Sequence, residues 1–151
     1  MRFTTENEMH NFDFVEGVLQ GVEKRNDHVD VMLANIKILG TNSCNRDIVS
    51  KRTNDLVVRI AGSTWRLYEE GYQLFDADLR PVKTVEDRQV KDEDVQHDLD
   101  LFTDCFLDGF EKQEKDGAFV YVMSLRVEDH TWRLEIDGTK DTEMWDRFLS
   151  L

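Results

Sequence analysis

The chain has 151 residues, a length that favours a single domain. Hydrophobic residues make up 40% of it and charged residues 34%, and nine Phe, three Trp and three Tyr can supply a core, so the composition excludes a disordered chain. The formal net charge is −13, and such a field repels phosphate backbones and anionic lipid, so we expect neither a nucleic-acid nor a membrane partner.

The first third of the chain predicts a short helical turn followed by strands. Thr5 and Glu8 have the spacing of a capping box, which would start the turn. Residues 12–24 predict a strand with glycines at bulges, and residues 28–39 predict a strand that is apolar on both faces and therefore central in its sheet. Residues 40–54 are polar and predict a surface insertion.

The middle of the chain predicts strands and then an acidic connector. Residues 56–60 and 65–67 alternate in polarity around Ala61-Gly62-Ser63, which predicts a hairpin, and residues 72–74 predict a further short strand. The connector, residues 82–101, is rich in Asp and Glu and predicts a short exposed helix at 92–100.

The last third predicts three strands and a helix. Residues 105–114 and 119–127 flank Lys115-Asp116-Gly117, a strong hairpin signal, and residues 130–136 form the return strand. Residues 141–150 predict a C-terminal helix, because the apolar residues in them fall at i, i+1, i+4 and i+5 on one stripe.

Two parts of the chain resemble each other. Thr64-Trp65-Arg66-Leu67 recurs as Thr131-Trp132-Arg133-Leu134, and five residues between 14 and 24 recur 88 positions later. The match predicts two diverged repeats, 12–76 and 102–138. We therefore expect an α+β fold: a mostly antiparallel sheet of seven to nine strands in two meander-like copies, with a connector helix and a C-terminal helix. A β-sandwich or half-open barrel is the alternative.

No catalytic motif is present. The histidines lack metal-ligand spacing, and there is no phosphate-binding glycine loop or nucleophile elbow. We therefore expect that the protein binds no cofactor and no metal and is not an enzyme. Cys44 and Cys105 are too sparse for a disulfide framework. With no apolar leader and no spanning segment in the sequence, we expect a soluble, cytoplasmic protein with free thiols.

The acidic character and the strand that opens with Phe12-Asp13-Phe14-Val15-Glu16-Gly17 resemble those of small, acidic, uncharacterised bacterial proteins, some of which are similar to the immunity proteins of polymorphic toxin systems. Many such proteins carry a His-Asp pair where this chain has Val15-Glu16. The resemblance implies a stoichiometric protein inhibitor.

Two functional hypotheses follow. The first is a non-enzymatic binding protein that meets a basic protein partner through acidic residues of the second half, namely Asp92, Glu93, Asp94 and Asp98. The second is a small-molecule or anion-binding module on a sheet face lined by Arg59, Arg66, Arg126 and Arg133. The competing interpretation of these arginines is that each is paired with a carboxylate across the sheet.

Overall fold

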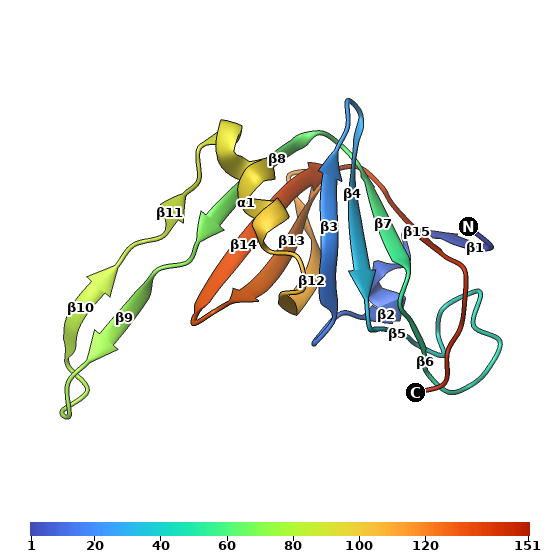
Figure 1. The fold of residues 1–151 in the computed structure, drawn as a ribbon, viewed down its shortest axis with the longest axis horizontal. Helices are drawn as coiled ribbons and strands as arrows, with labels where there is room; N and C mark the ends of the chain where they lie inside the picture. The colour runs from blue at the N-terminus through green and yellow to red at the C-terminus, as the bar shows by residue number, and fades with distance from the viewer.

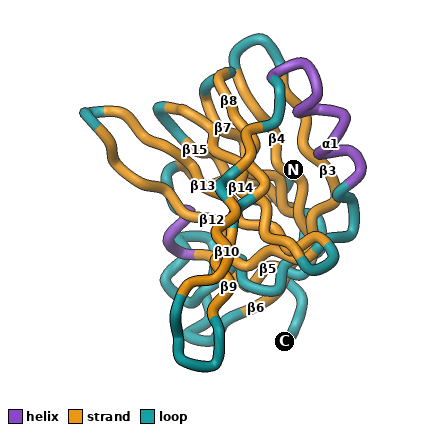
Figure 2. Tube along the Cα trace, turned by 90° about the vertical axis from the view of Figure 1, so that its left-hand side faces the viewer, coloured by secondary structure: helices purple, strands orange, loops and turns teal.

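The computed structural model describes all 151 residues and is mostly antiparallel β-sheet, with one short α-helix (Figures 1 and 2). The strands are β1 (Phe3–Glu6), β2 (Phe12–Asp13), β3 (Val18–Lys24), β4 (His28–Ala34), β5 (Ile36–Ile38), β6 (Lys51–Thr53), β7 (Leu56–Ala61), β8 (Thr64–Glu69), β9 (Tyr72–Phe75), β10 (Pro81–Val85), β11 (Arg88–Gln89), β12 (Phe106–Lys115), β13 (Ala118–Val127), β14 (His130–Gly138) and β15 (Asp141–Trp145). The helices are the 3₁₀ turns η1 (Met9–Asn11) and η2 (Asp92–Asp94) and the α-helix α1 (Val95–Leu101).

The predicted β-rich, mostly antiparallel fold is therefore confirmed, and η2 with α1 forms the helix expected at 92–100. The expected number of strands was too small, since there are fifteen. Several of the additional strands are two to four residues long, and hydrophobic periodicity cannot resolve segments of that length.

Ten strands make one sheet in the order β1-β15-β7-β4-β3-β12-β13-β14-β8-β11. β7 runs on into β8, and β14 runs on into β15. These two bent strands pair with each other in one register, with Trp132 opposite Glu69 at one end and Met144 opposite Val57 at the other. Because β4, β3, β12 and β13 also connect β7 to β14, the sheet curves back and closes on itself at the bends (Figure 1).

Close backbone packing produces the bends. A Cβ placed on Gly62 would lie 2.1 Å from the carbonyl oxygen of Asp137, so only glycine fits there. The amide of Ala61 donates to the carbonyl of Lys140 at 2.9 Å, which carries the ladder across the bend. The predicted 56–60/65–67 hairpin is consequently wrong: β7 and β8 do not pair with each other.

The inward side chains of the curved sheet form the core, and two covering segments complete it. Val95, Leu99 and Phe102 from the α1 segment are buried on one side, where the Phe102 ring packs 4.9 Å from that of Trp132. Met9, Phe12 and Phe14 from the N-terminal segment are buried in the same core. No helix in the chain has the length and apolar character required to cross a membrane.

The predicted C-terminal helix at 141–150 is wrong. Residues 141–145 form β15, which lies between β1 and β7. The inward positions of β15 are Asp141, Glu143 and Trp145, all fully buried. Because two of these three residues are acidic, the alternation that marks a strand is hidden, while the apolar residues that follow mimic a helical stripe.

The predicted capping box at the N-terminus is also absent. Thr5 lies in β1, and the Thr5 hydroxyl donates to the carboxyl of Glu143 at 2.9 Å instead of capping a helix. The polar insertion at 40–54 does run over the surface, although Asn45 is buried, where its side-chain amide donates to the carbonyls of Ile38, Leu39 and Val49.

Candidate functional site

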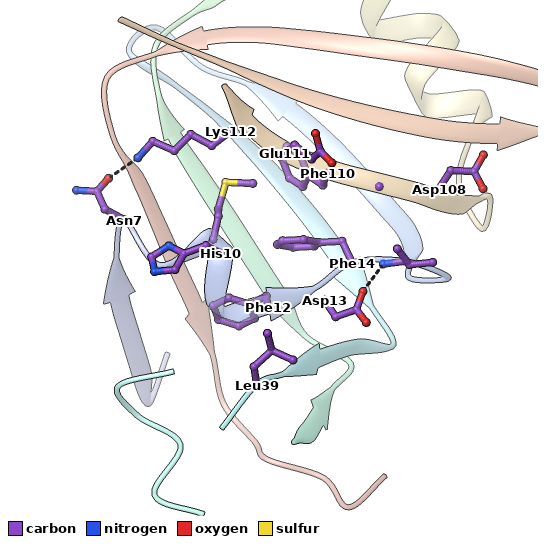
Figure 3. Close-up of a pocket in the computed structure, with 13 residues that line it drawn as sticks. Asn7, His10, Phe12, Asp13, Phe14, Leu39, Asp108, Phe110, Glu111 and Lys112 are labelled. Carbon is purple, nitrogen blue, oxygen red and sulfur yellow. Dashed lines mark hydrogen bonds between the residues drawn. The ribbon is translucent and has the colours of Figure 1, made fainter. Parts of the chain in front are cut away.

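The largest hollow of the molecule is an open cleft with a volume of about 720 Å³ (Figure 3). It lies between the N-terminal segment and strand β12. Its lining residues are Asn7, Met9, His10, Phe12, Asp13, Phe14, Val15, Leu39, Asp108, Gly109, Phe110, Glu111 and Lys112.

The cleft exists because β12 leaves its neighbour β3 early. The two strands meet only around Phe106 and Leu107, where the Leu107 amide donates to the carbonyl of Gly17 at 2.8 Å. The register of β12 then shifts between Leu107 and Gly109, and from Gly109 to Lys115 its only strand partner is β13. The cleft is therefore bordered by a strand edge that has no strand beside it.

The floor of the cleft is aromatic. Phe14 packs edge-on against Phe110, with ring centroids 5.2 Å apart, and Phe12 lies 6.1 Å from Phe14. These three rings are almost completely buried, so they present only a thin apolar surface to a ligand.

The rim of the cleft is acidic. Asp13, Asp108 and Glu111 stand around it, and Val15 adds an exposed apolar side chain. Asp108 forms an ion pair with Arg126 of β13, and Asp13 accepts a hydrogen bond from the Val15 amide at 3.1 Å. Glu111 forms no salt bridge, so its charge is available to a bound cation.

Lys112 closes one end of the cleft and connects it to a buried polar cluster. Its ammonium donates to Asp141 at 3.0 Å and to the side chain of Asn7 at 3.4 Å, and it lies 4.1 Å from the centre of the Phe119 ring. The Tyr121 hydroxyl donates to the same carboxylate oxygen of Asp141 at 2.9 Å.

The buried cluster ties the N-terminal wall of the cleft to the sheet. Glu143 accepts hydrogen bonds from the Thr5 hydroxyl and from the Glu8 amide, both at 2.9 Å. Asp141 accepts one from the Met9 amide at 3.3 Å. Asp141 and Glu143 are i and i+2 on one strand, so both point inward.

The two carboxyl groups differ in protonation. Burial, reinforced by the Asp141 carboxylate beside it, raises the pKa of Glu143 well above its ordinary value. Burial also acts to raise the pKa of Asp141, but the neighbouring Glu143 carboxyl group, together with hydrogen bonds from Lys112 and Tyr121, outweighs burial and leaves that pKa below its ordinary value. Burial and the Asp141 charge raise the pKa of the Tyr121 hydroxyl. The cluster therefore holds one neutral and one ionised carboxyl group.

The position of the buried Asp141–Glu143 cluster suits a structural role. Both carboxyl groups have no exposed surface, so a molecule in the cleft would meet Lys112 and Asn7 before it reached either acid. The arrangement positions a cleft wall and leaves an apolar floor under an acidic rim, which suits binding of a cationic and partly apolar segment.

The acidic residues predicted from the sequence lie elsewhere. Asp92, Glu93 and Asp94 form η2 and are exposed, and Asp98 lies half-buried on α1. None of the four lines the cleft.

Each of the four predicted arginines is engaged by carboxylates. Arg59 donates twice to Asp30, at 2.8 and 3.0 Å, and Arg126 pairs with Asp108. Arg66 and Arg133 come together around Glu135, at 2.9 and 2.8 Å. The remaining partners are Asp137 for Arg66 and Glu70 and Asp87 for Arg133. The four arginines thus follow the paired interpretation, because each forms an ion pair with at least one carboxylate.

Sequence reasoning missed Lys112, Tyr121, Asp141 and Glu143. They come from the β12–β13 hairpin and from β15, and only the alternation of Asp141, Glu143 and Trp145 could have indicated inward acids. Comparisons with known proteins add nothing to this picture, because no family model, no curated protein and no solved structure matches the chain.

Proposed function

We propose that the chain is a non-enzymatic binding protein that holds a basic segment of a protein partner in the cleft beside β12. The observation that carries the proposal is the combination of an acidic rim, an aromatic floor and a free strand edge in one place. An extended peptide can add to such an edge through its backbone, while its side chains reach the floor and the rim.

The net charge of −13 supports the same partner class, because it speeds the approach of a basic protein and repels acidic ones. An immunity-type inhibitor, which neutralises a basic toxin stoichiometrically, belongs to this class and agrees with the sequence resemblance. The two free thiols, Cys44 and Cys105, fit a reducing compartment such as the cytoplasm.

Fluorescence anisotropy with labelled peptides tests the proposal. The probe alternates Lys or Arg with Phe or Leu, and its control replaces every basic residue with Glu. We expect the basic probe alone to bind, and the double change Asp13→Asn and Glu111→Gln to weaken its binding by about tenfold.

The acidic helix provides the matched control. The quadruple change of Asp92, Glu93, Asp94 and Asp98 to Asn or Gln removes more charge but lies outside the cleft. It should slow association slightly and leave the peptide's dissociation rate unchanged. Equal binding of both probes, or a larger loss in the quadruple variant than in the cleft variant, would exclude the cleft as the binding site.

We also propose that the two halves of the chain descend from one duplicated unit. Four hydrogen bonds between residues 16–19 and 104–107, where β3 and β12 begin, support this because they form two equivalent pairs: Glu16 N to Leu107 O matches Asp104 N to Leu19 O, and Leu107 N to Gly17 O matches Leu19 N to Cys105 O. Glu16 and Asp104 both have positive φ, at 65° and 72°. All of these matches use the spacing of 88 residues found in the sequence.

The equivalence of Trp65 and Trp132 that the sequence suggested does not fit the spacing of 88 residues. Both side chains are buried, but β8 follows a bend and β14 follows a hairpin. Strand order instead relates the bent strand β7–β8 to the bent strand β14–β15, each of which follows a hairpin, β3–β4 or β12–β13.

A further inference from the structure

We propose that two copies of this chain associate symmetrically through an arm formed by β9, β10 and the turn between them, residues 72–85. This proposal is independent of the cleft. The arm is a two-stranded sheet of its own that projects away from the closed sheet (Figure 1). No other strand pairs with either of its outer edges.

The arm is exposed and apolar. Its large side chains range in exposed fraction from 44% at Tyr72 to 81% at Leu79. The others are Leu74, Phe75 and Val82. A ribbon of two strands with neither face covered is only marginally stable in water, and an exposed apolar cluster of this kind marks an interaction surface.

The arm is nevertheless a built feature, because its base is fixed. The chain pairs antiparallel both in the large sheet, where β11 lies beside β8, and in the arm, where β10 lies beside β9. The arm is therefore a continuation of this edge of the large sheet. At its base, the Gly71 amide donates to Asp87 at 2.7 Å, and Arg88 pairs with Glu69 at 3.3 Å. The sheet therefore holds the arm in a defined direction.

Charge identifies the occupant as a second copy. The arm carries two acids, Asp76 and Asp78, and two bases, Arg80 and Lys83, so it is neutral on a chain of net charge −13. A two-fold axis brings the same patch against itself, which requires a self-complementary surface. Equal numbers of acids and bases meet this requirement, whereas a strongly basic or acidic partner would leave two like charges opposed.

The direction of the arm removes the main electrostatic obstacle to this dimer. Two copies that meet through projecting arms keep the acidic bodies of the molecules apart, and repulsion between exposed charges is largely screened beyond about 8 Å at physiological ionic strength. A free edge of each arm can pair with the other, which turns two marginal ribbons into one four-stranded sheet.

Sedimentation velocity of the full chain between about 1 μM and about 1 mM tests the proposal. We expect a monomer–dimer equilibrium. The triple change Leu74→Thr, Phe75→Thr and Val82→Thr keeps residues that favour strands but removes the apolar cover, and it should raise the dimer dissociation constant by more than about tenfold. Thermal unfolding of the variant should match that of the wild type, since the arm lies outside the core.

A charge exchange tests the symmetry separately. Arg80→Glu with Lys83→Glu gives an arm of one sign, and Asp78→Lys gives an arm of the other sign. Each variant alone should be monomeric, and an equal mixture of the two should dimerise. Asp76 is left unchanged because its carboxylate accepts the Asp78 and Arg80 amides, at 2.9 and 3.0 Å, and so holds the turn.

Three results would overturn the proposal: a wild-type chain that remains monomeric over the whole range, a dimer that neither set of arm variants weakens, or a dimer abolished by Asp13→Asn with Glu111→Gln. The third result would place the arm of one copy in the cleft of the next. Peptide binding by the arm variants is expected to equal that of the wild type, so failure here leaves the cleft proposal intact.

Discussion

Glu143 is the residue on which the N-terminal wall of the cleft depends most directly. It is fully buried, and while one carboxyl oxygen receives two hydrogen bonds, the other, Oε2, has no partner. An ionised carboxylate would be costly in this position, beside the charge of Asp141. The neutral acid is therefore the form that fits, which makes the stability of the fold dependent on pH.

The sign of this dependence follows from the raised pKa of Glu143. Below its ordinary pKa of 4.5 the group is protonated in both the folded and the unfolded chain. As the pH rises above 4.5, the unfolded chain releases the proton and the folded chain keeps it. Unfolding is then favoured by up to about 1.4 kcal/mol per pH unit, until the pH reaches the raised value. Asp141, whose pKa is lowered, acts in the opposite direction only as the pH falls below its ordinary value of 3.8.

Glu143→Gln should therefore stabilise the chain at high pH. The amide keeps an oxygen for Thr5 and Glu8 and cannot ionise. Urea unfolding at about pH 4.5 should give similar free energies for variant and wild type, and the variant should be more stable by at least about 1 kcal/mol at about pH 8. Glu111→Gln, on the exposed rim, is the control and should leave the wild-type curve unchanged. An identical pH dependence in Glu143→Gln would contradict the assignment of the proton.

Trp145 is the second residue with a large predicted effect. It is fully buried among Phe3, Phe12 and Phe148, whose ring centroids lie 5.7, 5.5 and 5.6 Å away. Trp145→Ala should cost about 3–5 kcal/mol of unfolding free energy in urea denaturation. Trp145→Phe should cost less, because the indole Nε1 has no hydrogen-bond partner to lose. Equal losses for the two substitutions would mean that the indole nitrogen, and not the packing, is what matters.

At the scale of elements, the bends of the two long strands determine the architecture. A Cβ on Gly62 would lie 2.1 Å from the Asp137 carbonyl and 3.0 Å from the Cα of Gly138, both backbone atoms of the opposing strand. Gly62→Ala should therefore destabilise the chain by about 1–3 kcal/mol or more, because the strands must separate. Gly109, at the register shift of β12, has no atom within 4 Å of such a Cβ.

Gly109→Ala is thus the matched control for Gly62→Ala. Its change should lie within about 1 kcal/mol of zero, with a small stabilisation expected from the less flexible unfolded chain. Thermal and urea unfolding of the two variants measure the difference. If Gly62→Ala is tolerated as well as Gly109→Ala, the bend is not fixed by close backbone packing.

The sequence predicted elements whose signals are local. Asp116 and Gly117 have φ of 53° and 80°, as the predicted hairpin requires, and β13 occupies almost the predicted residues. Prediction from the sequence failed where the structure depends on contacts between residues that are far apart in the chain. The step from Ala61 to Ser63 looks like a hairpin turn, and only the opposing backbone of Asp137 makes it a bend. The cleft could not be predicted at all, because its walls are separated by about a hundred residues of chain.

For the whole molecule, the excess of negative charge should appear as a salt dependence of stability. Folding brings the charges of a −13 chain close together, and their repulsion acts over a screening length that shrinks from about 10 Å at 0.1 M salt to about 3 Å at 1 M. The free energy of unfolding of the wild type should therefore rise with salt. The buried cluster around Asp141 is shielded from solvent and should contribute little to this rise.

Two variants of opposite sign test this expectation by urea unfolding at low and high salt. Neutralising Asp92, Glu93, Asp94 and Asp98 reduces the excess negative charge from −13 to −9 (−13 + 4), and should reduce the rise in stability with salt while leaving the fold intact. Removing the repulsion stabilises the folded chain, but part of this stabilisation will be offset, because three of these acids precede the N-terminus of α1 and interact favourably with it. Lys37→Gln with Arg46→Gln, two exposed positions, increases the excess negative charge to −15 (−13 − 2) and should steepen the rise in stability with salt. Each change is expected to amount to about 1 kcal/mol or less. One slope shared by all three proteins would show that local contacts, and not the overall field, govern how this acidic chain responds to salt.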